Sequence, residues 1–275
     1  MLDLLAHCHD FVEFSSGPRY AATLAASLGA TLTGMYVAPA LQLPRTSDER
    51  SGLAAEYLAY AHEGFERARL AHPEFARWAA RFAAHSTHWQ LAIGDTAQAL
   101  VAAGNCTDLL VIEHRARNPD DSLPAIARAL LSGVSCIVVP ESEADAKPTW
   151  KRIAIAWNGS VGAVRAVHAA LPVLRMAAEI QLLVLPSSAG RLEQSSVPEF
   201  PVERYLERHG ISAKWHSVAA SQQSVDQAIL VESSRLGIDL LVMGAFGTTR
   251  VQPDHLRGIT TRVLQQSLLP VFLRH

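Results

Sequence analysis

The sequence predicts an α/β protein of two tandem domains, each a doubly wound sheet of five parallel strands. Three observations support this prediction. Short apolar segments alternate with helical ones, the order of segments occurs twice, and a charged stretch ending in proline, 141–148, separates the copies. Apolar strands that alternate with helices are typical of parallel sheets covered on both faces. We therefore expect domains at residues 1–142 and 149–275.

The repeat is clearest in its fourth strand, where Asp108-Leu-Leu-Val-Ile recurs as Asp239-Leu-Leu-Val-Met. Internal repetition of this kind indicates two copies of one structural unit. Each copy reads as β-α-β-α-β-α-β-α-β. The strands expected in the first half lie near 4–9, 31–37, 87–93, 108–112 and 136–139, and its helices near 18–28, 48–84, 96–103 and 123–131, with a break near His72-Pro73.

The second half follows the same order with a shorter second helix. Its strands are expected near 153–157, 180–185, 211–218, 238–243 and 270–273, and its helices near 161–176, 201–209, 224–236 and from 258 onward. Ser160 is the expected N-cap of the first of these helices. Pro172 should kink this helix or mark its last turns, because proline removes a hydrogen bond.

Composition narrows the classes of function. The 275 residues carry 24 Lys and Arg against 26 Asp and Glu, so no basic field is expected to recruit nucleic acid or an anionic membrane. The N-terminal stretch does not have the pattern of a secretory signal, and no apolar run reaches bilayer-spanning length. Three widely spaced cysteines indicate reduced thiols. We expect a soluble, cytoplasmic protein.

A candidate site lies in the last repeat unit, where a buried strand runs through a glycine-bearing loop into a helix. Such a unit brings backbone N–H groups and a helix N-terminus to the carboxyl end of a strand, where anions are commonly held. Two residues separate Gly244 from Gly247, and ten more separate Gly247 from Gly258, which Thr260 follows. Gly244 and Gly247 could instead do no more than shape a tight turn.

This pattern resembles the universal stress protein family, whose ATP-binding members carry G-x2-G-x9-G followed by Ser or Thr in the same strand, loop and helix. The resemblance extends over the whole chain, since tandem members have two such domains, with an adenine nucleotide hydrolase-like fold, packed as an internal pseudo-dimer. It implies a stress-response regulatory or binding role and an ATP site, with Mg²⁺, in the C-terminal domain only. The residues that it assigns to this site are Asn158, Gly159, Ser160, Gly244, Gly247, Thr248, Gly258 and Thr260.

The spacing leaves two alternatives open. The family's spacing would place its third glycine at Arg257, where a side chain would crowd a phosphate; alternatively the loop has one extra residue and Gly258 is that glycine. Asn158 stands where the family has Asp, keeping an acceptor but losing the charge. It could equally make only the turn between strand and helix.

The N-terminal half departs further from the pattern, and we expect it to bind no nucleotide. His9 or Asp10 replaces the nucleoside-contacting Asp, and Glu113-His-Arg-Ala replaces the Gly-x-x-Gly segment. A glutamate at the first position of a phosphate loop repels phosphate.

Three hypotheses for function follow. The first is nucleotide-dependent regulation of an unidentified protein partner. The second is a dimerisation or interaction scaffold without nucleotide, and the third is a slow ATPase, for which Asp254 and His255 are the local candidates. The family's dimers pair through their last strands, so 136–139 and 271–273 should meet within the chain, and a homodimer of the whole chain is a further option.

Other residues are expected to have structural roles or are weaker candidates for a site. His7 and His9 share a strand face and could ligate a metal, but no third ligand is visible nearby. Trp157 and Trp215 are expected in the core or between domains. Cys8 and Cys136 lie in apolar strands and are expected to be buried thiols.

Overall fold

The computed structural model describes residues 2–40, 62–115, 119–141, 148–185, 200–218, 224–245 and 258–275, and within these all side chains except those of 119–121. The N-terminal half, 2–141, contains β1 (Asp3–Cys8), α1 (Ser16–Leu28), β2 (Thr31–Ala38), α3 (His72–Ala80), β3 (Thr87–Ile93), α4 (Thr96–Gly104), β4 (Leu109–His114), α5 (Pro119–Leu131) and β5 (Cys136–Pro140). Residues 62–69 are also helical, so the expected break falls at Leu70 and Ala71.

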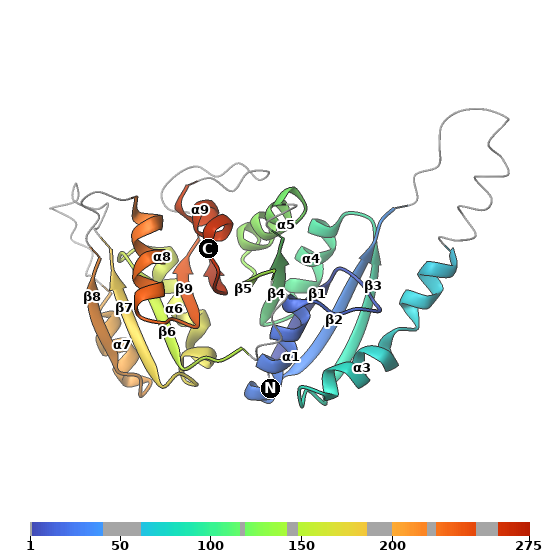
Figure 1. Cartoon of the computed structure of the whole chain (residues 1–275), viewed down its shortest axis with the longest axis horizontal. Helices are drawn as coiled ribbons and strands as arrows, with labels where there is room; N and C mark the ends of the chain where they lie inside the picture. Colours follow the sequence, from blue (N-terminus) through green and yellow to red (C-terminus); the bar gives the residue numbers. More distant parts are fainter. Residues whose placement is uncertain are drawn as a thin grey trace.

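The C-terminal half, 148–275, repeats this order (Figure 1). It contains β6 (Arg152–Trp157), α6 (Val161–Leu174), β7 (Glu179–Val184), α7 (Val202–Arg208), β8 (Ala213–Ser217), α8 (Val225–Arg235), β9 (Leu240–Gly244), α9 (Ile259–Gln266) and β10 (Val271–Arg274). Pro172 lies in the last turn of α6, as predicted.

The ten strands of the described residues form one sheet in the order β3-β2-β1-β4-β5-β10-β9-β6-β7-β8. Neighbouring strands are parallel except where β5 meets β10, which pair antiparallel with Phe272 opposite Ile137. The prediction that the last strands of the halves meet inside the chain is therefore confirmed. This pairing turns two apolar edge strands into the centre of the sheet.

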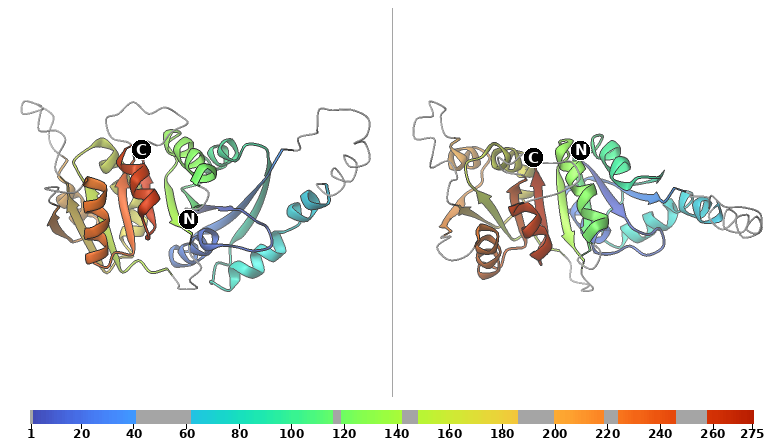
Figure 2. Two further views of the ribbon diagram at one scale, coloured as in Figure 1. Left: turned by 45° about the horizontal axis from the view of Figure 1, so that its top comes forward. Right: turned by 90° about the horizontal axis from the view of Figure 1, so that it is seen from above.

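Helices cover both faces of this sheet (Figure 2). Alternate residues of a strand point to opposite faces, so in β4 Leu109 and Val111 join one core, and Leu110 and Ile112 join the other. The first core contains buried residues of α1, α3, α6 and α7, and the second contains those of α4, α5, α8 and α9. Each core runs through both halves of the chain.

The internal repeat extends to individual hydrogen bonds. Asp108 Oδ2 accepts from the amide of Asp3 at 2.8 Å, and Asp239 Oδ2 accepts from the amide of Arg152 at 2.9 Å. Each aspartate thus holds the start of the first strand of its half against the fourth. The repeated sequence pattern is therefore a repeated structure.

Trp215 corrects one expectation. Its side chain is 49% exposed, and its Nε1 donates to Glu203 Oε1 at 3.2 Å. Trp215 belongs to β8, which lies at one edge of the sheet that the described strands form. The apolar pattern of this segment does not reveal that the strand lies at an edge.

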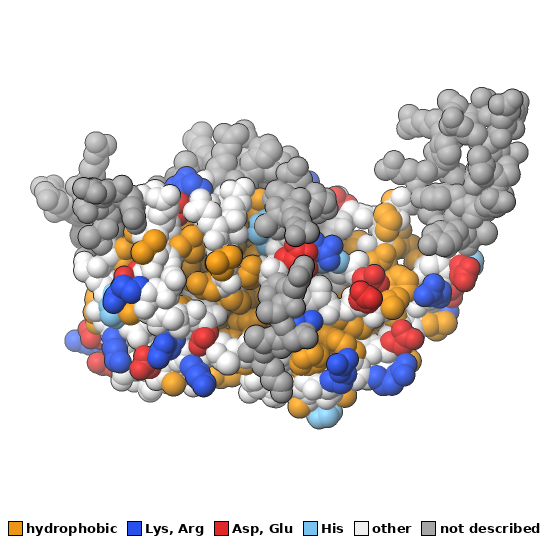
Figure 3. Space-filling model, viewed as in Figure 1, with side chains coloured by type: hydrophobic (Ala, Val, Ile, Leu, Met, Phe, Trp, Pro, Cys, Tyr) orange, Lys and Arg blue, Asp and Glu red, His pale blue; other side chains and the backbone are white. Residues whose placement is uncertain are grey.

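Surface charge is mixed. On the face in Figure 3, Lys and Arg side chains are interspersed with Asp and Glu. Among the described helices, none is long and apolar enough to cross a membrane.

Candidate functional site

The turn between β6 and α6 is held by its own side chains. Asn158 Oδ1 accepts from the amide of Ser160 at 3.1 Å, and Gly159 has a φ of 72°, in the left-handed region that favours glycine. Ser160 is the N-cap of α6, as predicted, and its Oγ accepts from the amide of Ala163 at 3.2 Å. Asn158 therefore makes the turn, and its amide nitrogen has no protein partner among the described residues.

Gly244 lets the start of α6 press against the end of β9. A Cβ at Gly244 would lie 2.5 Å from the carbonyl carbon of Gly162 and 2.6 Å from the amide nitrogen of Ala163. The φ of Gly244 is not positive, so its lack of a side chain serves close packing and not a special turn. This contact places the N-terminus of α6 beside the carboxyl end of β9.

Gly258 begins α9. It is the N-cap residue, with φ 94° and ψ −152°, a conformation open almost only to glycine. No side chain caps this helix, and its first turn contains no acidic residue. The first-turn amides of α9 therefore lack a side-chain acceptor at the N-cap. Of the two spacing alternatives, this helix start fits the one in which Gly258 is the third glycine.

The hydroxyls behind Gly258 differ. Thr260 is buried and has a polar partner, whereas Thr261 Oγ1 is buried without a hydrogen-bond partner in the described part of the chain. The loop that carries Gly247, Thr248, Asp254, His255 and Arg257 lies outside the described residues.

An ion pair fixes the orientation of α9. Arg262 Nε donates to Asp226 Oδ1 of α8 at 2.9 Å, and the Asp226 side chain is only 1% exposed. The same relation occurs in the N-terminal half between Arg128 of α5 and Asp95, the N-cap of α4, at 3.6 Å. The two helices on this face are thus tied together in both copies.

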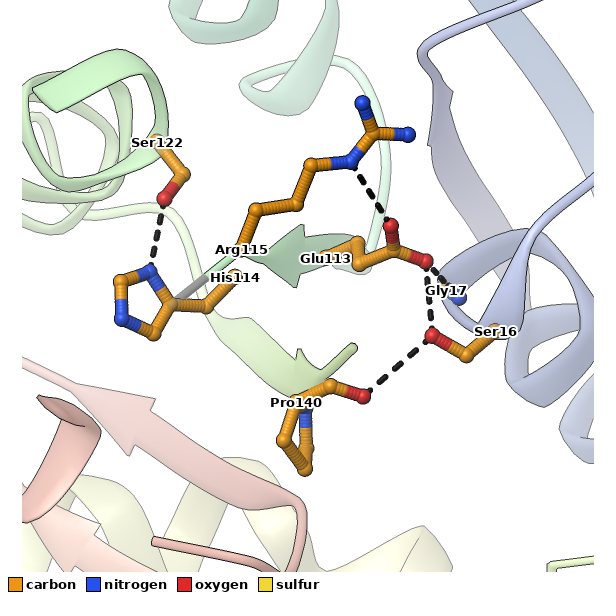
Figure 4. A network of polar contacts seen from close by, with 7 residues as sticks. All are labelled: Ser16, Gly17, Glu113, His114, Arg115, Ser122 and Pro140. Carbon is orange, nitrogen blue, oxygen red and sulfur yellow. Dashed lines mark hydrogen bonds and ion pairs between the residues drawn. The ribbon is translucent and has the colours of Figure 1, made fainter. Parts of the chain in front are cut away.

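In the N-terminal half a glutamate occupies the position that corresponds to Gly244 (Figure 4). The Glu113 carboxylate accepts from the hydroxyl of Ser16 at 2.7 Å and from the amide of Gly17 at 2.9 Å, both at the start of α1. Its other oxygen accepts from Arg115 Nε at 3.1 Å. The side chain is completely buried. A carboxylate of the protein therefore occupies the helix N-terminus where an external anion would bind.

Two opposing effects act on the acidity of Glu113. Burial alone would raise the pKa of its carboxyl, but hydrogen bonds from the Gly17 amide, the Ser16 and Ser15 hydroxyls and Arg115 together hold the pKa below its usual value of 4.5. The group is thus charged at neutral pH. The structure thus places a negative charge at the position where the sequence predicts that phosphate is repelled.

Three histidines, His7, His9 and His114, lie near the ends of β1 and β4. The rings of His7 and His9 are 4.5 Å apart, and His114 Nδ1 lies 2.7 Å from Ser122 Oγ. Burial, with a smaller effect of His9, lowers the pKa of His7 to about 3, and burial also lowers the pKa of His114. In the parts of the chain that are described, no group of three His, Cys, Asp or Glu side chains could hold a metal ion.

The thiols follow the prediction. Cys8 and Cys136 are buried, and burial raises the pKa of Cys136 to about 12 and that of Cys8 further. Neither is poised for nucleophilic chemistry, which requires a thiolate.

The sequence predicts that Glu113 repels phosphate, but it does not predict that the Glu113 carboxylate caps α1. The signal that could have revealed this is the Ser15-Ser16-Gly17 stretch, whose hydroxyls and free amide are the donors that a buried carboxylate needs. The close contact of Gly244 with Gly162 was also missed, because it joins two segments that are far apart in the sequence.

No known family model and no curated protein matches the sequence. Solved structures do match. A universal stress protein from Archaeoglobus fulgidus DSM 4304 aligns with a TM-score of 0.65 at 16% identity, over 99% of this chain and 96% of its own. A putative universal stress protein from Pseudomonas aeruginosa UCBPP-PA14 aligns with a TM-score of 0.56 at 14% identity, over 100% and 93%.

A protein of unknown function from Pseudomonas aeruginosa PAO1 has the same TM-score of 0.56 at 12% identity, over 100% of this chain and 92% of its own. Identities this low establish the fold alone. The chain has, over its whole length, the fold of these universal stress protein structures.

Proposed function

We propose that this chain is a tandem member of the universal stress protein family that acts in the cytoplasm as a stress-response regulatory protein. In this proposal it binds one adenine nucleotide, ATP with Mg²⁺, in its C-terminal half. The nucleotide state then alters a surface that a protein partner recognises.

One observation carries the proposal, namely that a carboxylate of the protein occupies a helix N-terminus in the N-terminal half, whereas none does so at the equivalent place among the described residues of the C-terminal half. In the N-terminal half, the Glu113 carboxylate accepts from the amide of Gly17 at the start of α1. In the C-terminal half, Gly244 stands in place of Glu113, and α9 begins at Gly258 without an acid in its first turn. Helix N-termini favour anions, and only the C-terminal pair is free of the protein's own carboxylates among the described residues.

The residues present fit a nucleotide. Backbone amides at the start of α9 would hold phosphate oxygens, and the absence of a side chain at Gly258 allows them to approach closely. The Asn158 side chain, whose Oδ1 is used by the turn, still has its amide N–H groups to offer a ribose or base. Gly247 and Thr248 would contribute from the loop. Bound Mg²⁺ would neutralise phosphate charge.

Calorimetric titration with MgATP tests the proposal. We expect one site per chain in the wild type. Asn158→Leu should weaken binding by about tenfold, because it removes a nucleoside contact, and Gly247→Trp should abolish it by blocking the loop. Asp10→Asn is the matched control, since Asp10 Oδ1 accepts from the amide of Val12 in the equivalent turn of the other half.

Two results would count against the proposal. Absence of binding, with no nucleotide carried through purification, would favour the interaction scaffold. Two sites per chain, or equal loss in Asp10→Asn, would show that the N-terminal half also binds.

A further inference from the structure

A second candidate site lies where the two halves meet, at the end of the sheet where β9 and β10 finish and β4 and β5 begin. A cleft of about 560 Å³ opens beside the starts of β4 and β5 and the end of β10, which runs antiparallel to them. Its remaining walls come from the end of α4 and the middle of α6. We call it the inter-half cleft. It shares no residue with the proposed nucleotide site.

Two arginines give this cleft its charge. Arg165 reaches it from α6 and Arg274 from β10, and Arg274 Nη1 donates to Ser135 Oγ at 3.3 Å. Neither guanidinium forms an ion pair with any carboxylate that the structure describes. Asp108 also lines the cleft, but its Oδ2 is engaged by the amide of Asp3. Two cations therefore face one acid in a concave site.

The internal repeat shows that the fold does not require this cleft. Gly17 corresponds to Gly162, so Tyr20 of α1 stands where Arg165 stands in α6. At that equivalent place Tyr20 is 3% exposed and its hydroxyl accepts from Trp150 Nε1 at 2.5 Å. Val139 of β5 corresponds to Arg274. The position beside α1 is therefore filled with aromatic and apolar side chains, whereas the equivalent position beside α6 is open and carries guanidinium groups.

The cleft continues into an apolar crevice. Asp108 and Ala169 line both, and the crevice adds Leu28, Pro172 and Phe272. The crevice measures about 30 Å³, enough for one small apolar group. The site thus offers cationic donors at its mouth and a short apolar contact behind them, as small-molecule sites commonly do.

We propose that the inter-half cleft binds a small organic anion, with a carboxylate or phosphate group held between Arg165 and Arg274. Guanidinium groups bind both kinds of anion with two parallel hydrogen bonds. Ser135 and the α4 end would add neutral donors. Both arginines belong to the C-terminal half, whereas Asn105 and Ser135 of the cleft belong to the N-terminal half, so the anion would contact both halves at once.

Titration of the ¹⁵N-labelled chain with succinate, with glycerol 3-phosphate and with uncharged succinamide tests the proposal. We expect the amides of Asn105, Gly133 and Ser135 to shift saturably with either anion and not with succinamide. Arg274→Gln should weaken the binding by at least about tenfold, because it removes a charge-assisted contact. Arg208→Gln, an exposed change on α7, should leave it unchanged.

Arg165→Gln keeps the test decisive if Arg274→Gln does not fold. Arg165 is exposed on α6, and no described residue pairs with it, so its loss should weaken binding without unfolding the chain. The proposal is overturned if neither anion shifts these amides saturably, if succinamide shifts them equally, or if the folded arginine variants bind like the wild type. Shifts confined to Gly258 and Ile259 would place the anion at the nucleotide site and would also overturn it.

Discussion

The Glu113 carboxylate decides how the two halves differ at the scale of single residues. It is completely buried, and it stays ionised because Ser16, Gly17 and Arg115 all donate hydrogen bonds to it. Charged hydrogen bonds of this kind are stronger than neutral ones. One side chain thus occupies the N-terminus of α1 and stabilises the start of that helix.

A pH-dependent loss of stability follows for Glu113→Gln. The pKa of Glu113 is lowered in the folded chain, so its contribution is present above its unfolded value of 4.5 and is lost as the pH falls through the folded value. We expect the variant to lose about 1.5–3 kcal/mol of unfolding free energy at pH 7. The deficit should shrink as the pH falls below the unfolded value.

Urea denaturation at neutral and acidic pH measures this difference. Glu207→Gln, an exposed change on α7, is the control and should match the wild type at both. A deficit that is the same at every pH would mean that the charge of Glu113 is not what stabilises α1.

Glu113 also illustrates what the sequence could reveal about the site. A glutamate in place of the first loop glycine predicts that phosphate is repelled, and the structure places this carboxylate at the start of α1. Ser16 and Gly17, which donate to it, are 97 and 96 positions away, so the pattern around Glu113 alone could not identify them.

At the scale of elements, α6 and β9 are locked together by two facing glycines. Gly244 has no room for a Cβ, whereas a Cβ on Gly162 would find its nearest atom, the Ala245 carbonyl oxygen, at 3.4 Å. Glycine is therefore required at position 244 but not at position 162. In the N-terminal half α1 also approaches β4 closely, but there the helix glycine lacks room: a Cβ on Gly17 would lie 3.0 Å from the Glu113 Cβ and 3.2 Å from its amide nitrogen.

The pair Gly244→Ala and Gly162→Ala tests this packing. We expect Gly244→Ala to lower the unfolding free energy by about 1–3 kcal/mol, because backbone atoms of α6 must shift. Gly162→Ala should be neutral or stabilising by up to about 1 kcal/mol, since alanine favours the helix. Thermal melts of both variants measure the difference. Equal effects would show that the space at Gly244 is not limiting.

Helices and strands are the features that the sequence predicts best. Apolar runs and helix signals located each strand and most helices, and Pro172 marked the last turn of α6 correctly. Segment ends were less certain: α5 begins at Pro119, before the expected start near residue 123, and β8 is shorter than its apolar pattern. These ends depend on packing, which a local pattern does not contain. Trp215 was misplaced for the same reason.

At the scale of the whole molecule, the antiparallel contact of β5 with β10 makes one sheet of two repeats. This contact was predicted from the resemblance to paired domains, and not from strand patterns, which leave the partner of an edge strand unspecified. Trp150 was not predicted. It lies before β6 and packs on Tyr20 of α1, with ring centroids 5.6 Å apart, so the start of one half is anchored on the other.

The central claim is that the chain binds one nucleotide, in its C-terminal half. Because both halves belong to one sheet, a single structure can show which half holds it. The most direct measurement is a crystal structure of the chain grown with ATP and Mg²⁺. We predict nucleotide density at the start of α9 near Gly258 and Asn158, with the Glu113 carboxylate still bound to the amide of Gly17. Density at the start of α1, or well-diffracting crystals without nucleotide at saturating ATP, would contradict the account.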